Sequence, residues 1–217
     1  MSKPLLVIGN KNYSSWSLRA WLMLKHAGMD FDELRIPLYV EGYKEKLFSC
    51  SPAGKAPVYR EGNLLVWDTL AIGEHLYESH PSLWPAQREA RARARSVSAE
   101  MHSGFMPLRK AMPMNIRARG RRVATSPELD ADIARIKAIW GELRTQHAGS
   151  GPWLFGQYSI ADAMFAPVAF RFLTYGVTGP GAVDEYVQTV ARDPLVQAWV
   201  RASELEQEVV ASSEVGV

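Results

Sequence analysis

The N-terminal segment constrains the fold more than any other part of the chain, because it combines two strand patterns with a helix between them. The continuous apolar run Leu5–Ile8 closes at Gly9 and is typical of a strand buried on both faces. Capping hydroxyls at Ser14–Ser17 precede a predicted helix over 18–27, and the alternation of apolar and polar residues over 31–38 predicts a second strand. Together these patterns predict a βαβ unit with a right-handed crossover.

A hairpin and a third helix complete the first predicted domain. The segments 56–59 and 64–67 flank a glycine-containing loop, which is typical of two antiparallel strands. A capped helix is predicted over 69–79, and 41–48 forms at best a short one. The element order β-α-β-α-β-β-α is a thioredoxin-like α/β arrangement.

Strand patterns end at Pro81 and Pro85, which bracket the predicted domain boundary. We expect a thioredoxin-like domain over 1–80 that binds the ligand, a linker over 81–89, and an all-α helical domain over 90–217. The second domain would contribute the pocket for a second substrate.

The second domain shows helical patterns throughout. Residues 87–119 predict helix with breaks near Pro107 and Pro113. An apolar stripe over 129–143 predicts an amphipathic helix, and the nearly uniform apolar segment 159–175 predicts a buried central one. A last helix is predicted to begin at Asp193-Pro194 and run through Trp199, followed by a frayed tail after Leu205.

Composition excludes several classes of function. A formal net charge of +2 is too weak to indicate binding to nucleic acid or a membrane surface. Cys50 is the single cysteine, which excludes an intramolecular disulfide and a cysteine-based metal cage. No stretch approaches the roughly 18 uninterrupted apolar residues of a membrane span, and the first apolar run is too short for a signal peptide. We therefore expect a cytoplasmic protein without a metal cofactor.

Three polar segments of the first domain are candidates for binding chemistry. Ser14 and Ser15 stand beside the free N–H groups of a helix start, which stabilise an anion such as a thiolate, although capping alone would also explain them. A cis bond before Pro57 would turn the N–H and C=O of Ala56 toward an extended peptide, whereas a trans proline at an edge strand is the simpler explanation.

The third segment, Asp68-Thr69, either caps its helix or binds the ammonium and carboxylate of a zwitterionic amino acid. A tripeptide with a zwitterionic head, an extended middle and a central thiol would use all three segments.

Four motifs in the order and spacing of one family support this interpretation. They are Ser14-Ser15-Trp16-Ser17-Leu18-Arg19, Gly54-Lys55-Ala56-Pro57-Val58, Asp68-Thr69, and Trp153–Asp162. Together they resemble the serine-type glutathione S-transferases, especially the zeta (maleylacetoacetate isomerase) class, over nearly the whole chain. The last motif resembles a capping box formed by Ser159 and Asp162, which serves folding and not binding. Two departures are Asp68-Thr69 in place of Glu-Ser and Trp16 in place of the zeta-class cysteine, so a zeta-specific activity is not implied.

The resemblance implies that Ser14 is the catalytic residue and donates a hydrogen bond to the glutathione sulfur, with Ser15 as its rival. The implied glutathione site comprises Ser14, Ser15, Lys44, Lys55, Ala56, Pro57, Asp68 and Thr69. In it Ala56 pairs with the cysteinyl backbone, Asp68 and Thr69 hold the γ-glutamyl group, and the lysines meet the glycine carboxylate.

A methionine-rich stretch is the candidate pocket for a small hydrophobic electrophile, because flexible thioethers suit a permissive apolar pocket. The candidates are Phe105, Met106, Arg109 and Met112, with helix core as the alternative for at least half of the stretch. The resemblance implies a transferase that uses glutathione as co-substrate. A glutathione-dependent isomerase or peroxidase, or a non-catalytic glutathione-binding module, are the alternatives. It also implies a homodimer that uses the helix over 69–79 and the basic segment Arg88–Arg95.

Overall fold

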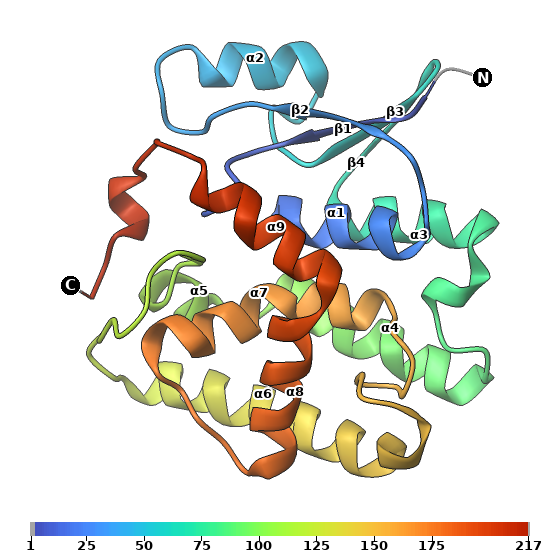
Figure 1. The fold of residues 1–217 in the computed structure, drawn as a ribbon, viewed down its shortest axis with the longest axis vertical. Coiled ribbons are helices and arrows are strands. Elements are labelled where there is room, and N and C mark those ends of the chain that lie inside the picture. The colour runs from blue at the N-terminus through green and yellow to red at the C-terminus, as the bar shows by residue number, and fades with distance from the viewer. Residues whose placement is uncertain (1–2, 217) are drawn as a thin grey trace.

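The computed structural model of the chain describes residues 3–216, which form a small mixed sheet at one end and a helical bundle at the other (Figure 1). The strands are β1 (Leu5–Ile8), β2 (Asp32–Arg35), β3 (Val58–Glu61) and β4 (Leu64–Trp67). Their order is β2-β1-β3-β4, with β1 parallel to β2 and the other neighbours antiparallel. The predicted βαβ unit and hairpin are therefore confirmed, although the second strand is shorter than the predicted 31–38 segment.

Two helices cover one face of the sheet and one covers the other. The helices of this half are α1 (Ser15–His26), α2 (Tyr43–Cys50) and α3 (Thr69–Ser79). Figure 1 shows α1 and α3 between the sheet and the helical bundle, and α2 on the outer side. Alternation along β1 explains this arrangement, because Leu6 and Ile8 pack in the main core while Val7 packs beneath α2 with Leu47.

The helical half surrounds a buried central helix, as its sequence predicted. Its helices are α4 (Arg88–Ser103), α5 (Met106–Ala111), α6 (Pro127–His147), α7 (Ile160–Tyr175), α8 (Gly181–Arg192) and α9 (Pro194–Glu204), with short 3₁₀ turns at Pro81–Leu83, Ala148–Ser150 and Ala211–Ser213. Helix α7 packs against α1, α4 and α8. One hydrophobic cluster runs from the sheet through α1 into α7 and α9. Because the core is shared in this way, the two-domain division with a linker at 81–89 stays a prediction. No helix among residues 3–216 has the length and apolar character needed to cross a membrane.

The predicted capping box at the start of α7 is confirmed. The Asp162 carboxylate accepts from the Ser159 N–H at 2.9 Å, and the Ser159 side chain completes the box. The same carboxylate also accepts from the Leu154 N–H at 3.0 Å and from the Tyr186 hydroxyl at 3.1 Å. The box therefore joins α7 to the preceding loop and to α8.

The predicted breaks near Pro107 and Pro113 are confirmed: α4 ends at Ser103, Pro107 lies in the first turn of α5, and α5 ends at Ala111. Two features nearer the C-terminus differ from the sequence analysis. Helix α8 was missed, although its buried residues recur at helical spacing along Gly181–Arg192. The tail after Leu205 is not frayed, because it packs against the β1–α1 loop and the segment after α5.

The basic segment at the start of α4 finds an acidic partner within the same chain. Arg95 makes a two-bond ion pair with Glu74 of α3, at 3.0 and 2.9 Å. The Arg95 charge, which we expected to contribute to a dimer interface, is thus paired with an acid of the same chain.

Candidate functional site

The β1–α1 turn presents two buried serines at the start of α1. Ser14 is the N-cap residue, and its hydroxyl donates to the Ser17 hydroxyl at 2.8 Å. Ser17 in turn accepts from the Gly9 N–H at 2.9 Å, which ties the turn to the end of β1. The Ser15 side chain makes no hydrogen bond within residues 3–216. Both hydroxyls lie at the positive end of a helix, where an anion is stabilised.

The peptide bond between Ala56 and Pro57 is cis, as predicted. Ala56 precedes β3, and neither its N–H nor its C=O has a hydrogen-bond partner within the described chain. An unpaired N–H and C=O at the open end of a strand form the pairing edge that an extended peptide uses.

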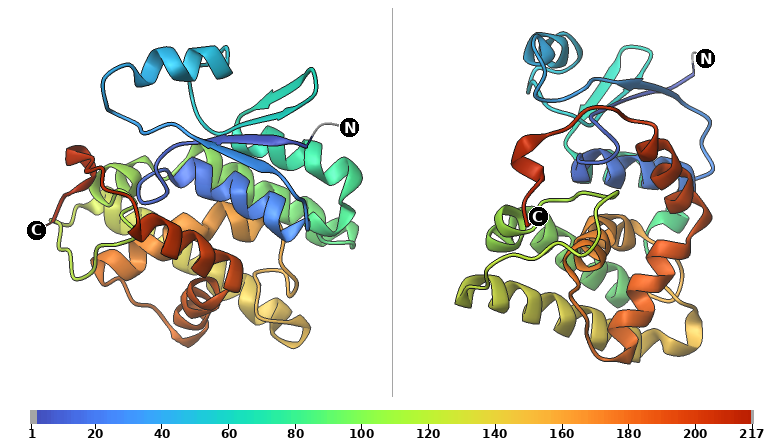
Figure 2. Two further views of the ribbon diagram at one scale, coloured as in Figure 1. Left: turned by 45° about the horizontal axis from the view of Figure 1, so that its top comes forward. Right: turned by 60° about the vertical axis from the view of Figure 1, so that its left-hand side comes forward.

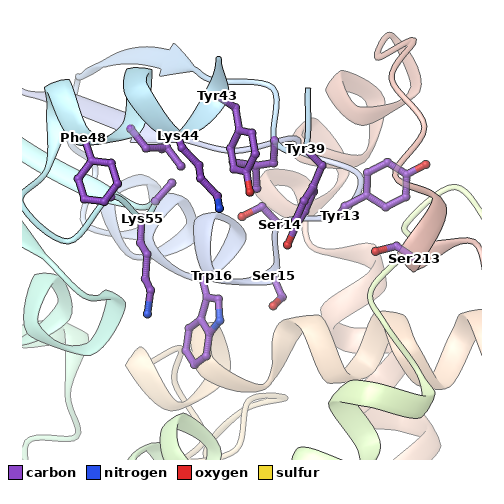
Figure 3. Close-up of a pocket in the computed structure, with 14 residues that line it drawn as sticks. Tyr13, Ser14, Ser15, Trp16, Tyr39, Tyr43, Lys44, Phe48, Lys55 and Ser213 are labelled. Carbon is purple, nitrogen blue, oxygen red and sulfur yellow. The ribbon is translucent and has the colours of Figure 1, made fainter. Parts of the chain in front are cut away.

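Two adjoining cavities bring the predicted glutathione residues together. The larger, about 560 Å³, is lined by Tyr13, Ser14, Ser15, Trp16, Leu38, Tyr39, Tyr43, Lys44, Leu47, Phe48, Gly54, Lys55, Ala56 and Ser213 (Figure 3). The smaller, about 450 Å³, is lined by Trp16, Ala53, Lys55, Ala56, Pro57, Trp67, Asp68, Thr69 and His102. Each of the eight residues predicted for glutathione lines one of them, and Trp16, Lys55 and Ala56 line both.

The side chains of Asp68 and Thr69, which were expected to bind a zwitterionic amino acid, are engaged within the protein. One Asp68 carboxylate oxygen caps α3 by accepting from the Leu70 and Ala71 N–H groups, and the other lies 2.7 Å from Nε2 of His102. The Thr69 hydroxyl donates to the Trp16 carbonyl at 3.2 Å. Within the described residues the backbone N–H groups of Asp68 and Thr69 have no hydrogen-bond partner and remain free as donors.

The sequence offered His102 as a residue that could polarise an electrophile, with a surface position as the simpler alternative. Its place beside Asp68 in the glutathione cavity was not predicted, because that contact arises only in the tertiary structure. His102 comes from α4, contacts Asp68, and packs edge-on against the Trp16 ring at 5.3 Å. Tyr39 and Tyr43 were missed because they fall in a segment with no pattern beyond its polarity. Figure 3 shows their rings beside Ser14, on the wall of the larger cavity.

The predicted electrophile residues do not line either cavity. Phe105 and Met112 are buried in the core, and Met106 is half exposed at the start of α5. The Arg109 guanidinium is held by the carbonyls of Met101 and Gly104, behind Trp16. The chain breaks at Gly104 and Phe105, so these residues lie in or after the turn into α5 and not on α4 beside His102.

Positive charge is concentrated behind Trp16. The guanidinium groups of Arg19 and Arg109 lie 4.5 and 4.8 Å from the Trp16 ring centre. Burial lowers the pKa of Arg19, Arg109 and Arg171, that of Arg171 to about 9, and repulsion among the three contributes to the shifts of Arg19 and Arg171. At neutral pH the cluster stays cationic, and its field favours an anion in the cavities that Trp16 lines.

Comparison with known proteins gives the same family for both halves of the chain. Residues 13–79 match the family described as "Glutathione S-transferase, N-terminal domain", and residues 126–202 match its C-terminal domain counterpart. The chain is 35% identical over 108 residues to "Probable maleylacetoacetate isomerase" of Caenorhabditis elegans, which is 49% of this chain and 50% of that protein. It is 31% identical over 111 residues to maleylacetoacetate isomerase of Rattus norvegicus, with the same shares. The chain thus spans about half the length of the curated relatives it matches.

A solved structure extends the similarity to nearly the full length. The crystal structure of a glutathione transferase homolog from Burkholderia, with bound glutathione, superposes with a TM-score of 0.71 at 25% identity. The superposition covers 94% of this chain and 98% of that one. With two domain matches in the expected order and a fold shared over nearly the whole length, the chain belongs to the glutathione S-transferase family.

Proposed function

We propose that this protein binds glutathione across the two cavities and activates its thiol, as a thiolate, for attack on a small electrophile. The unpaired N–H and C=O of Ala56, opposite the start of α1, carry this proposal. An extended cysteinyl residue that pairs with Ala56 would direct its side chain to the helix N-terminus at Ser14 and Ser15.

The two ends of the tripeptide have complementary groups on either side of Ala56. In the smaller cavity, the Asp68 carboxylate would attract the γ-glutamyl ammonium and the Thr69 N–H would donate to its carboxylate. In the larger cavity, Lys44 and Lys55 would meet the glycine carboxylate. Both lysines line this cavity, and in Figure 3 both side chains point from the α2 side of the cavity toward the side where Trp16 lies.

Thiol activation needs a modest stabilisation of the anion. A free thiol has a pKa of about 8.5, and lowering it by about two units takes about 2.7 kcal/mol. A hydroxyl donor and a helix N-terminus supply about 1–2 kcal/mol each in a partly buried site. The guanidinium cluster behind Trp16 adds to both. The thiol proton would leave to solvent. The sulfur would then form a bond to the electrophilic carbon, which either releases a leaving group with its bonding electron pair or, at a double bond, passes the π pair to the neighbouring atom, where solvent protonates it.

The test compares pH–rate profiles of Ser14→Ala and Ser15→Ala. We expect Ser14→Ala to change glutathione affinity by less than about tenfold, since the other contacts persist. Its turnover should fall at neutral pH and recover partly as pH rises, because the helix N-terminus still lowers the thiol pKa. A shift confined to Ser15→Ala would move the role to Ser15, and no shift in either variant would exclude hydroxyl activation.

A glutathione-dependent isomerase is the second candidate, and the names of the curated relatives favour it. A panel of electrophiles, hydroperoxides and cis-alkene substrates, each assayed with glutathione, distinguishes transferase, peroxidase and isomerase. Tight glutathione binding with no turnover of any of them would favour a non-catalytic module instead.

We also propose that the protein is a homodimer through α3 and the start of α4. Family membership supports this. Light scattering at micromolar concentration tests it, and a monomeric mass would refute it.

A further inference from the structure

The chain after α9 returns to the sheet and crosses the start of α1. We call residues 206–216 the C-terminal strap. Figure 2 (right) shows it arching over the first turn of α1, and Figure 1 shows it passing from α9 toward the sheet before it turns back to the C-terminus. Glu206 and Val210 of the strap are buried, and Ser213 forms part of the wall of the larger cavity.

Glu206 binds the loop directly before the two serines. One of its carboxylate oxygens accepts from the Lys11 N–H at 2.7 Å, and the other accepts from the Asn12 N–H at 3.0 Å. The carboxylate is buried, and Arg35 at 3.5 Å compensates part of its charge. Hydrogen bonds to an ionised acceptor are short and strong, so two of them fix consecutive peptide units of this loop.

Glu214 holds the next residue of the same loop. Its carboxylate accepts from the Tyr13 hydroxyl at 2.7 Å and from the Asn115 side chain at 2.8 Å, and it pairs with Arg121. Asn115 in turn accepts from the Asn12 side chain at 2.9 Å. The strap therefore contacts, directly or through Asn115, each residue from Lys11 to Tyr13.

The loop has few constraints of its own. Its internal backbone bonds run from Tyr13 and Ser14 to the Asn10 carbonyl, at 3.3 and 2.8 Å. Catalytic groups need to be held within about 0.5 Å of their productive positions, and a misplacement of about 1 Å costs on the order of 100-fold in rate. Groups from outside the loop supply the rest: the Asn12 carbonyl accepts from the Ile116 N–H at 3.2 Å, and the Lys11 carbonyl accepts from the Trp199 indole at 2.8 Å. The strap adds the charged acceptors, which bind the Lys11 and Asn12 N–H groups and the Tyr13 hydroxyl.

We infer that Glu206 and Glu214 are positioning residues, which hold the β1–α1 loop so that Ser14 and the N-terminus of α1 face the glutathione sulfur. This inference rests on the proposed function. It assigns the two carboxylates a role in thiol activation and none in glutathione affinity, because neither Glu206 nor Glu214 lines either cavity.

The matched pair for the test is Glu206→Gln and Glu204→Gln. Each removes one negative charge, but Glu204 is exposed at the end of α9 and has no hydrogen-bond partner among the described residues. We expect Glu206→Gln to lower kcat by about tenfold or more, with the Kd for glutathione changed by less than about threefold. The pKa of the bound thiol, read from thiolate absorbance, should rise in Glu206→Gln and stay at the wild-type value in Glu204→Gln.

A double-mutant cycle with Ser14→Ala links the strap to the serine. If Glu206 acts through Ser14, its substitution has little further effect once Ser14 is alanine, so the two losses are less than additive. Additive losses, or equal kcat and thiol pKa in the Glu206→Gln and Glu204→Gln variants, would overturn the inference. If Glu206→Gln does not fold, Glu214→Gln in the same cycle decides the question. The proposed function fails in a different way, because it is refuted if neither Ser14→Ala nor Ser15→Ala shifts the pH–rate profile, whatever the Glu206 variants do.

Discussion

Asp162 should serve the folding of this protein and not its chemistry, and Asp162→Ala tests this. The carboxylate is fully buried and accepts from the backbone N–H groups of Leu154 and Ser159 and from the hydroxyls of Ser159 and Tyr186. It lies on α7 and lines neither cavity. Its loss should therefore reduce stability without altering the site.

The magnitude follows from two opposing effects. Two buried N–H groups left without acceptors cost about 1–3 kcal/mol each, and the hydroxyls add less because they can rotate to other acceptors. Against this, burial raises the pKa of Asp162 to about 6, more than its hydrogen bonds lower it. That shift of about two units means the charged carboxylate itself costs about 3 kcal/mol at pH 7. The two N–H groups together cost about 2–6 kcal/mol, so the net expected loss is at most about 3 kcal/mol, or up to roughly 10 °C in Tm for a chain of this size.

The raised pKa also fixes the direction of the pH dependence. Between about pH 4 and 6 the folded protein binds more protons at Asp162 than the unfolded chain does, so stability falls as pH rises through this range. Asp162→Asn removes the titration and keeps one acceptor oxygen. The free energy of unfolding of the wild type should therefore decline by about 3 kcal/mol relative to Asp162→Asn between pH 4 and 7.

The assay is urea unfolding of wild type, Asp162→Ala and Asp162→Asn at a series of pH values, with glutathione affinity measured at pH 7. Unchanged Tm with lost glutathione binding in Asp162→Ala would refute the structural assignment. If the free energy of unfolding of the wild type rises relative to that of Asp162→Asn as pH increases, burial does not raise the pKa of Asp162.

Three further predictions concern the site and its surroundings. Lys55→Ala should weaken glutathione binding by about two- to fivefold, as expected of an exposed ion pair, while binding of γ-glutamylcysteine and the behaviour of the exposed control Lys46→Ala stay unchanged by calorimetry. His102→Gln should raise the KM for glutathione several-fold at nearly constant kcat, because it loosens Asp68; a fall in kcat alone would contradict this. Arg171→Met should leave the free energy of unfolding within about 1 kcal/mol of wild type or raise it, because the guanidinium is buried and has no acid beside it among the described residues. A loss above about 3 kcal/mol would show instead that the hydrogen bond from Arg171 to the Met112 carbonyl dominates.

Local sequence patterns determined much of this protein. The β1 strand, the serine-rich start of α1, the hairpin and the Ser159–Asp162 box were all predicted from residues within a few positions of one another. Such signals are reliable because capping, turn formation and side-chain periodicity depend on neighbouring residues. The cis bond at Pro57 was predicted from its place at the start of a strand together with the family motif.

Tertiary structure alone decided which of these segments meet, and with what partners. The bond between Glu206 and Lys11 joins residues 195 positions apart, and nothing in the tail's own sequence distinguishes a docked strap from a frayed end. Met101, Met112 and Met114 became core while Met106 stayed half exposed, and Asp68 acquired His102 because α4 passes beside α3. A residue's contacts across the fold depend on how whole elements pack, since packing is the sum of many weak, non-directional interactions that no single segment encodes.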